Sequence, residues 1–139
     1  MSLMIHGYVL MTSGGTPLWF RFFRNMSDDE KEKYELFSSA IAAVFSLINE
    51  TLGDDVKEVI TNNHRLFLVR SGDIILLVVA DKKTKAPTDE FSKFVNRIAS
   101  RIDPEIPIEE LFVQSIIDAL AEFEIRIEEL NTIEKLSHI

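Results

Sequence analysis

The sequence predicts an α/β (α+β) domain, a three-layer α/β/α sandwich around one five-stranded antiparallel sheet. The main observation is a run of seven apolar residues at 74–80, between Gly72-Asp73 and Asp81. A half-buried strand would alternate apolar with polar residues, so this run predicts a central strand covered on both faces. Apolar residues at helical spacing occur once before the run and twice after it, which supplies helices for both faces. The predicted order is β-β-α-β-β-β-α-α.

The first two strands are predicted at residues 4–11 and 18–24, joined as a hairpin. Gly14 and Gly15 lie between them, and paired glycines allow the positive φ angles of tight hairpin turns. Because side chains alternate along a strand, the second strand has two faces. One face carries Trp19, Arg21 and Phe23, and the other carries Leu18, Phe20 and Phe22.

A long helix is predicted over residues 28–52. Ser27 and Glu30 have the spacing of a capping box, and Asp28 and Asp29 lie in the first turn, where the helix dipole favours anions. Gly53 occupies the position of a left-handed C-terminal cap. Helical spacing is shown by Phe37, Ala40, Ile41, Val44, Phe45, Ile48 and Leu52. At 1.5 Å per residue this helix would run about 36 Å and cross the whole sheet.

The next three strands are predicted as a meander over residues 56–61, 65–70 and 74–80, the first of them a polar edge strand. An amphipathic helix follows at 91–102 and ends at Asp103-Pro104. The last helix is predicted from Pro107 to Leu130, since proline suits a first helical turn. Its apolar stripe is Ile108, Leu111, Phe112, Ile116, Ala119, Leu120, Phe123, Ile127 and Leu130. Residues 131–139 are predicted to be either a continuation of this helix or a tail.

Length and charge define the class of protein. The 139 residues predict a single domain, in which residues 1–3 are interpreted as an expression leader. The net charge of −8 disfavours nucleic acid and anionic lipid as partners, and the apolar run is too short to insert into a membrane.

There are no cysteines, which excludes thiolate metal sites and thiol catalysis. We expect a cytoplasmic protein without a signal peptide, and abundant isoleucine favours a prokaryotic or archaeal source.

The sequence predicts no catalytic residues, cofactor or metal. His6, His64 and His138 lie on three different segments without metal-ligand spacing, and they are interpreted as strand, turn and tail histidines. Residues 13–16 resemble an anion-binding nest but lack the lysine and following helix of a phosphate loop, which favours a hairpin turn. Lys82, Lys83 and Lys85 are interpreted as a solvated loop, with contact to an acidic partner as the alternative.

Carboxylates of the last predicted helix are a further candidate set. They are Glu109, Glu110, Asp118, Glu122, Glu124, Glu128 and Glu129. Acid–base catalysis requires two carboxylates in a cleft with separated pKa values. Most of these residues alternate with the apolar stripe, so they are interpreted as a solvated helix face, with attraction of a basic partner as the alternative.

Three segments resemble longin domains, also called SNARE-like or profilin-like domains. Residues 13–21 resemble the hairpin of longins in vesicle-tethering and GTPase-exchange complexes, residues 39–55 their first helix and its exit, and residues 64–80 their paired strands. Roadblock domains are related but begin with a helix, whereas here the first strand begins almost at the first residue. The resemblance implies a non-catalytic module that binds a small GTPase or another longin- or roadblock-like subunit, and that can form a homodimer.

The predicted interaction residues are Trp19, Arg21 and Phe23. Tryptophan, other aromatic residues and arginine are enriched at binding hot spots, and an edge strand invites strand addition from another chain. The alternative is that a helix packs over these side chains.

A small-ligand-sensing domain of profilin- or PAS-like shape is the alternative function, and it requires a pocket with converging polar groups. The bulky, continuous apolar stripes instead predict a filled core. An enzyme ranks third, because the sequence shows no nucleophile–base pair or metal set.

Overall fold

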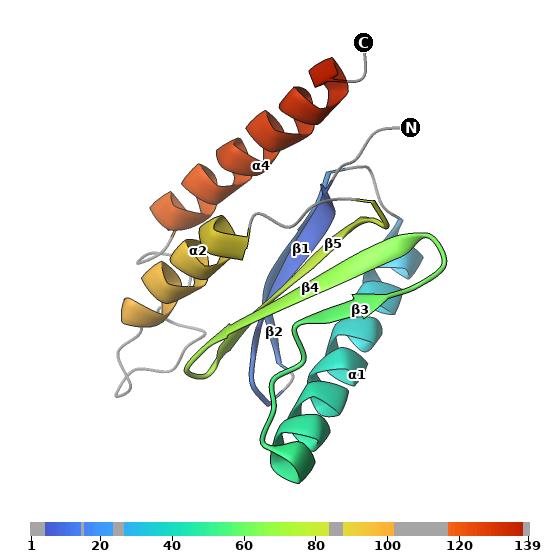
Figure 1. The fold of residues 1–139 in the computed structure, drawn as a ribbon, viewed down its shortest axis with the longest axis vertical. Coiled ribbons are helices and arrows are strands. Elements are labelled where there is room, and N and C mark those ends of the chain that lie inside the picture. The colour runs from blue at the N-terminus through green and yellow to red at the C-terminus, as the bar shows by residue number, and fades with distance from the viewer. Residues whose placement is uncertain (1–4, 15, 24–26, 84–87, 102–116, 138–139) are drawn as a thin grey trace.

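The computed structural model describes residues 5–14, 16–23, 27–83, 88–101 and 117–137. Figure 1 shows one sheet with α1 on one face and with α2 and α4 on the other. The elements in chain order are β1 (Ile5–Thr12), β2 (Pro17–Phe22), α1 (Asp28–Leu52), β3 (Glu58–Ile60), β4 (His64–Ser71), β5 (Ile74–Asp81), α2 (Thr88–Ser100) and α4 (Ile117–Ser137). The predicted three-layer sandwich is confirmed.

The sheet has the strand order β2-β1-β5-β4-β3, and every neighbouring pair is antiparallel. The apolar strand β5 is therefore central, and residues 74–80 are all buried. β3 forms one edge of the sheet, as its polar character predicts, and β2 forms the other edge.

Alternation along β5 divides the core in two, because successive side chains point to opposite faces. Ile75, Leu77 and Val79 pack toward α1, where they meet Ala42 and Phe45. The other side chains of β5 pack toward α2 and α4. Helix residues of that second core are Phe91, Phe94, Val95, Ile98, Ala119, Leu120, Phe123 and Ile127.

Both ends of α1 form as their residues predict. The Glu30 backbone N–H donates to Ser27 Oγ at 3.2 Å, and Gly53, with φ of 72°, donates its N–H to Asn49 O at 2.8 Å. The apolar stripe of α1 is only partly used, however, since Val44 and Leu52 are exposed. The predicted stripe was wider than the part of the helix that the sheet covers.

One face assignment on β2 was wrong. Leu10 pairs with Trp19 while Met11 pairs with Pro17, so Leu18 is an extra residue in a β-bulge. A bulge interrupts the period of two, and Leu18 packs on the same core as Trp19 and Phe23 instead of joining Phe20. The hairpin itself is confirmed, but positive φ angles among the described glycines occur only at Gly53 and Gly72.

The helix α2 begins and ends at other residues than the sequence suggests, since it runs from Thr88 to Ser100. The described part of the last helix, α4, begins at Ile117. It extends to Ser137, which supports a continuation of the helix over a tail. The predicted stripe residues Ile108, Leu111, Phe112 and Ile116 lie outside the described residues, as do Pro107, Glu109 and Glu110.

Candidate functional site

The three predicted interaction residues lie on the β2 edge, on the face that α2 and α4 cover. Trp19 and Phe23 are half-buried and pack against the core beneath these helices. The Arg21 side chain is 52% exposed, and its guanidinium carbon lies 5.8 Å from the centre of the Phe23 ring. The two aromatic residues therefore pack under the helices, as the alternative interpretation expects, and Arg21 is exposed between them.

A buried tyrosine connects this edge to the last helix. The Tyr8 hydroxyl donates a hydrogen bond of 2.7 Å to Glu124 Oε1, and Glu124 Oε2 lies 4.0 Å from Arg21 Nε. Tyr8 is fully buried. Burial raises the pKa of its phenol well above the usual range, the bond to Glu124 raises it further, and the charge of Arg21 opposes the rise. The contacts of Tyr8 and Arg21 with Glu124 thus form a network that joins β1 and β2 to α4.

Sequence reasoning did not find this network. Glu124 was assigned to a solvated helix face, and Tyr8 was not singled out. The available signal was a tyrosine followed directly by the apolar residues Val9, Leu10 and Met11 in a predicted strand, because a buried tyrosine O–H requires a partner.

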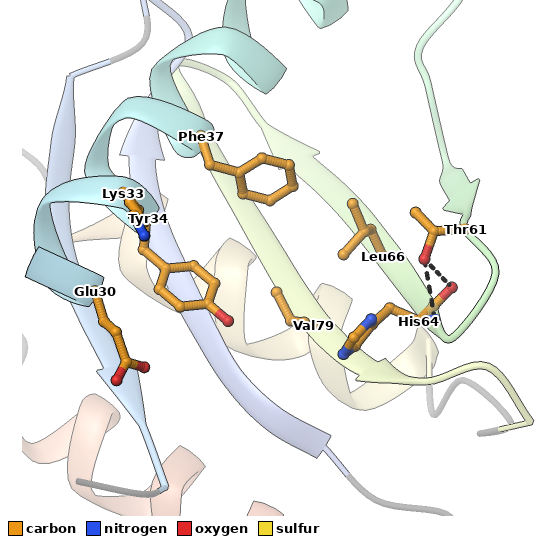
Figure 2. Close-up of a pocket in the computed structure, with 8 residues that line it drawn as sticks. All are labelled: Glu30, Lys33, Tyr34, Phe37, Thr61, His64, Leu66 and Val79. Atoms are coloured by element: carbon orange, nitrogen blue, oxygen red, sulfur yellow. Dashed lines mark hydrogen bonds between the residues drawn. The ribbon is translucent and has the colours of Figure 1, made fainter. Parts of the chain in front are cut away.

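A second candidate is a groove of about 460 Å³ between α1 and the sheet. Figure 2 shows Tyr34 and Phe37 projecting from α1 toward Leu66 and Val79, with Glu30 and Lys33 on the helix side. His64 and Thr61 lie on the opposite side, where the His64 backbone N–H donates to Thr61 Oγ1 at 3.0 Å. The groove thus has an apolar floor, which includes Leu66 and Val79, and a polar rim, which includes Glu30, Lys33 and His64. The sequence predicted a filled core and no such groove.

Two histidines that are remote in sequence meet next to this groove. His6 Nε2 lies 2.6 Å from Asp81 Oδ1, and the rings of His6 and His64 contact edge to face with centres 5.6 Å apart. The pairing of β1 and β4 with β5 brings them together, which spacing along the chain cannot show. Among the described residues there is no group of three or more metal-type ligands arranged to hold an ion. His138 lies outside the described residues.

Ion pairs join α4 to α2 and to Arg101, which follows α2 directly. Arg101 Nη1 lies 2.5 Å from Asp118 Oδ1, Arg126 Nη2 lies 2.7 Å from Glu90 Oε1, and Arg97 bonds Glu122. Hydrogen bonding to Arg101 lowers the pKa of Asp118, and hydrogen bonding to Arg97 lowers that of Glu122. The solvated face of α4 therefore also holds α4 against α2 through these ion pairs.

Two loops remain from the sequence analysis, the turn at residues 13–16 and the lysine-containing loop after β5. The Ser13 backbone N–H donates to Asp73 O at 2.8 Å, so the glycine-containing turn is tied to the neighbouring strand turn. Lys82 and Lys83 are exposed, and Lys85 lies outside the described residues.

α1 is the one described helix that is long and apolar enough to cross a membrane by length and composition. Core helices of soluble proteins pass the same test, and α1 packs on the sheet through Ala42 and Phe45.

Comparison with known structures finds proteins to which this chain is similar. A crystal structure of a Roadblock/LC7 domain from Streptomyces avermitilis matches with a TM-score of 0.55 and 17% identity, covering 70% of this chain and 84% of that chain. A homology model of the full-length AP-3 complex in a stretched open conformation matches with a TM-score of 0.48 and 12% identity, covering 97% of this chain and 98% of that chain. No family model and no curated protein matches the sequence. The topology and the roadblock likeness together show that the chain has a longin- and roadblock-like fold.

Proposed function

We propose that this chain is a non-catalytic, cytoplasmic protein-interaction module that binds a small GTPase or assembles with another longin- or roadblock-like subunit. The observation that supports a binding role is the β2 edge, where Arg21 is exposed between two anchored aromatic residues. The non-catalytic part of the proposal and the identity of the partners rest on the longin resemblance.

The β2 surface offers two kinds of contact. Among the described strands β2 pairs with β1 alone, so its outer edge offers backbone N–H and C=O groups to an added strand. Arg21 offers a guanidinium to a carboxylate of the partner. Because Glu124 and Phe23 already hold this side chain, binding costs less side-chain entropy than it would for a free arginine.

The test is capture of partners from native lysate by the tagged wild-type chain and by an Arg21→Gln variant. Glutamine removes the charge while keeping a long polar side chain, so the fold is retained. Lys57→Gln is the matched control, because Lys57 is also exposed and lies beside the opposite sheet edge. We expect a GTPase or a longin-like subunit with wild type and with Lys57→Gln, and much less of it with Arg21→Gln. Equal capture by all three chains would assign binding to another surface.

The groove supports small-ligand sensing as a second candidate function. Its volume of about 460 Å³ is within the range of ligand pockets, roughly 300–1,000 Å³. Glu30, Lys33 and His64 supply polar groups over the apolar floor. Native mass spectrometry of the purified chain separates the two functions. A stoichiometric small molecule that is lost in a Tyr34→Ala variant favours sensing, and a ligand-free chain that captures a protein favours the interaction module.

A further inference from the structure

The backbone of β2 has one side bonded to β1 and the other side at the edge of the sheet. The Phe23 N–H donates to His6 O at 2.9 Å, so the backbone groups of Phe23 point toward β1. These groups alternate in direction along an antiparallel strand, and residues 19–22 pair with β1 without a register shift. The backbone groups of Phe20 and Phe22 therefore point outward from the sheet edge, and those of Arg21 point inward.

This alternation determines how an added strand would lie against β2. A strand that joins β2 in the antiparallel direction forms its hydrogen bonds with Phe20 and Phe22. Its residue opposite Arg21 lies in a non-hydrogen-bonded pair, where the two Cα atoms are about 4.5 Å apart and the side chains are closest. Opposite residues of such a ladder point to the same face. The side chain opposite Arg21 therefore lies beside the guanidinium, on the face that α2 and α4 cover.

The Arg21 guanidinium can bind a carboxylate at this position. Its side chain is 52% exposed, and it approaches Glu124 through Nε at 4.0 Å, which is longer than a hydrogen bond. Among the described residues Glu124 is the one acidic partner of this guanidinium. The terminal Nη groups supply N–H donors in a planar fork that matches the two oxygens of a carboxylate.

The neighbours of Arg21 define the residues that should flank the carboxylate. Trp19 and Phe23 are half-buried on the same face, so side chains two positions before and after the carboxylate meet an aromatic surface and should be apolar. Phe20 and Phe22 pack on the opposite core, so the positions directly beside the carboxylate favour uncharged, β-branched residues.

We propose that β2 binds an extended acidic segment of another protein, with an Asp or Glu opposite Arg21 and an apolar residue two positions to either side. This inference rests on the proposed binding role of the β2 edge and names the chemistry of the partner segment. The segment adds one antiparallel strand to the sheet, outside β2.

Charge selects this occupant over other strands. A charged side chain in an edge strand deters pairing with unrelated strands. A basic segment would place like charges in contact, and an apolar segment would desolvate the guanidinium without pairing it. The β2 strand of a second copy is also disfavoured in this register, because it would place Arg21 against Arg21.

The first experiment measures peptide binding to the full chain by fluorescence anisotropy. The labelled peptide contains Leu-Thr-Glu-Thr-Val between serine residues. One control replaces the glutamate with glutamine, and the other has the order Leu-Glu-Thr-Thr-Val. Moving the glutamate by one position turns its carboxylate to the opposite face of the sheet while keeping the composition. We expect each control to bind about three- to tenfold more weakly.

The second experiment tests whether Arg21 itself makes the contact. In an Arg21→Gln variant, whose fold circular dichroism verifies, the glutamate and glutamine peptides should bind with equal affinity, because the interaction that separates them is gone. Lys57→Gln is the matched control at the opposite edge and should keep the wild-type preference for glutamate.

The third experiment tests the register through N-methylation of the peptide backbone. The amides of the two threonines face Phe20 and Phe22, so methylating either one should remove a hydrogen bond to β2 and abolish measurable binding. The amide of the glutamate opposite Arg21 points away from β2. Methylating that amide should leave the affinity within about twofold of the parent peptide.

Two results would overturn the proposal. One is absence of peptide binding to the wild-type chain at every concentration, and the other is equal affinity of the glutamate and glutamine peptides for it. If Arg21→Gln nevertheless reduces the capture of a GTPase or longin-like subunit from lysate, the proposed function stands and the partner binds by another geometry. If peptide binding depends on Arg21 and the captured GTPase or subunit does not, the acidic segment stands and the proposed partner class fails.

Discussion

The Tyr8 hydroxyl, buried beneath α4, donates to Glu124 Oε1 at 2.7 Å and so joins the first strand of the sheet to the last helix of the chain. Two aromatic rings hold the phenol in place, since the Phe123 and Phe94 rings meet it edge to face at 5.1 Å and 6.2 Å between centres. This contact fixes α4 over β1 and positions the carboxylate that faces Arg21.

Removing the hydroxyl in Tyr8→Phe should destabilise the fold. The substitution leaves the partly buried Glu124 without its donor, and a hydrogen bond to a charged group contributes about 1.5–3 kcal/mol. Urea unfolding measures the loss. Tyr34→Phe is the control and should change the free energy of unfolding by less than about 0.5 kcal/mol. Equal losses in the two variants would show that the bond to Glu124 contributes nothing specific.

The ionisation of Tyr8 should be coupled to unfolding at high pH. Its pKa is raised in the folded state, mainly by burial and then by Glu124. The associated stability is complete below the pKa of an unfolded tyrosine, about 10, and is lost as the pH rises above it. The chain has two tyrosines, so in Tyr34→Phe the phenolate absorbance reports on Tyr8 alone. That absorbance should appear together with loss of circular dichroism, and a phenolate in the folded chain near pH 10 would contradict the prediction.

Acid should loosen the contact between α2 and α4. Hydrogen bonding to Arg101 and Arg97 lowers the pKa of Asp118 and Glu122 in the folded chain. Their contribution is therefore present above their unfolded pKa values, near 4, and is lost as the pH falls through the lower folded values. Thermal unfolding of wild type and of Asp118→Asn/Glu122→Gln should show a smaller loss of Tm between neutral and acid pH in the variant. Glu128→Gln, on the same helix, should behave like wild type.

Gly7 should not tolerate a side chain. A Cβ added there would lie 2.6 Å from the backbone oxygen of Arg21 and would also collide with the Phe22 ring. A strand backbone cannot yield cheaply, so Gly7→Ala should destabilise the chain by about 1–3 kcal/mol. Gly14→Ala is the matched control, because the nearest atom to its added Cβ is 3.8 Å away. Comparable unfolding midpoints in the two variants would contradict the clash.

The fold was predictable where a residue pattern has a single local cause. Residues 74–80 lack polar alternation because both faces of β5 are covered, and Ser27 and Gly53 mark the ends of α1 through hydrogen bonds within a few residues. The bulge at Leu18 was not predictable, because it depends on how β1 and β2 pair and not on the residues of β2 alone.

The candidate sites were less predictable, because they depend on contacts between remote segments. Arg21 and its aromatic neighbours were found from residue type, but their partner Glu124 is on the last helix and looks like any solvated carboxylate. His6 and His64 come together only through the strand order. Leu36 and Leu47 of α1 were not singled out from the sequence, and Leu52 was placed in the apolar stripe although it is exposed, because spacing alone does not tell which apolar stripe of a helix the sheet will cover.

The strand order also determines when this chain can fold. β1 pairs with β5, which joins Thr12 to Ile74 and Ile5 to Ala80 across everything between them. Such distant pairing gives a high contact order and slow folding. During synthesis, β1 and β2 leave the ribosome long before β5, so the inner edge of β1 stays unpaired until residue 81 has been made. A nascent chain arrested before β5 is therefore an open hairpin that other strands can join.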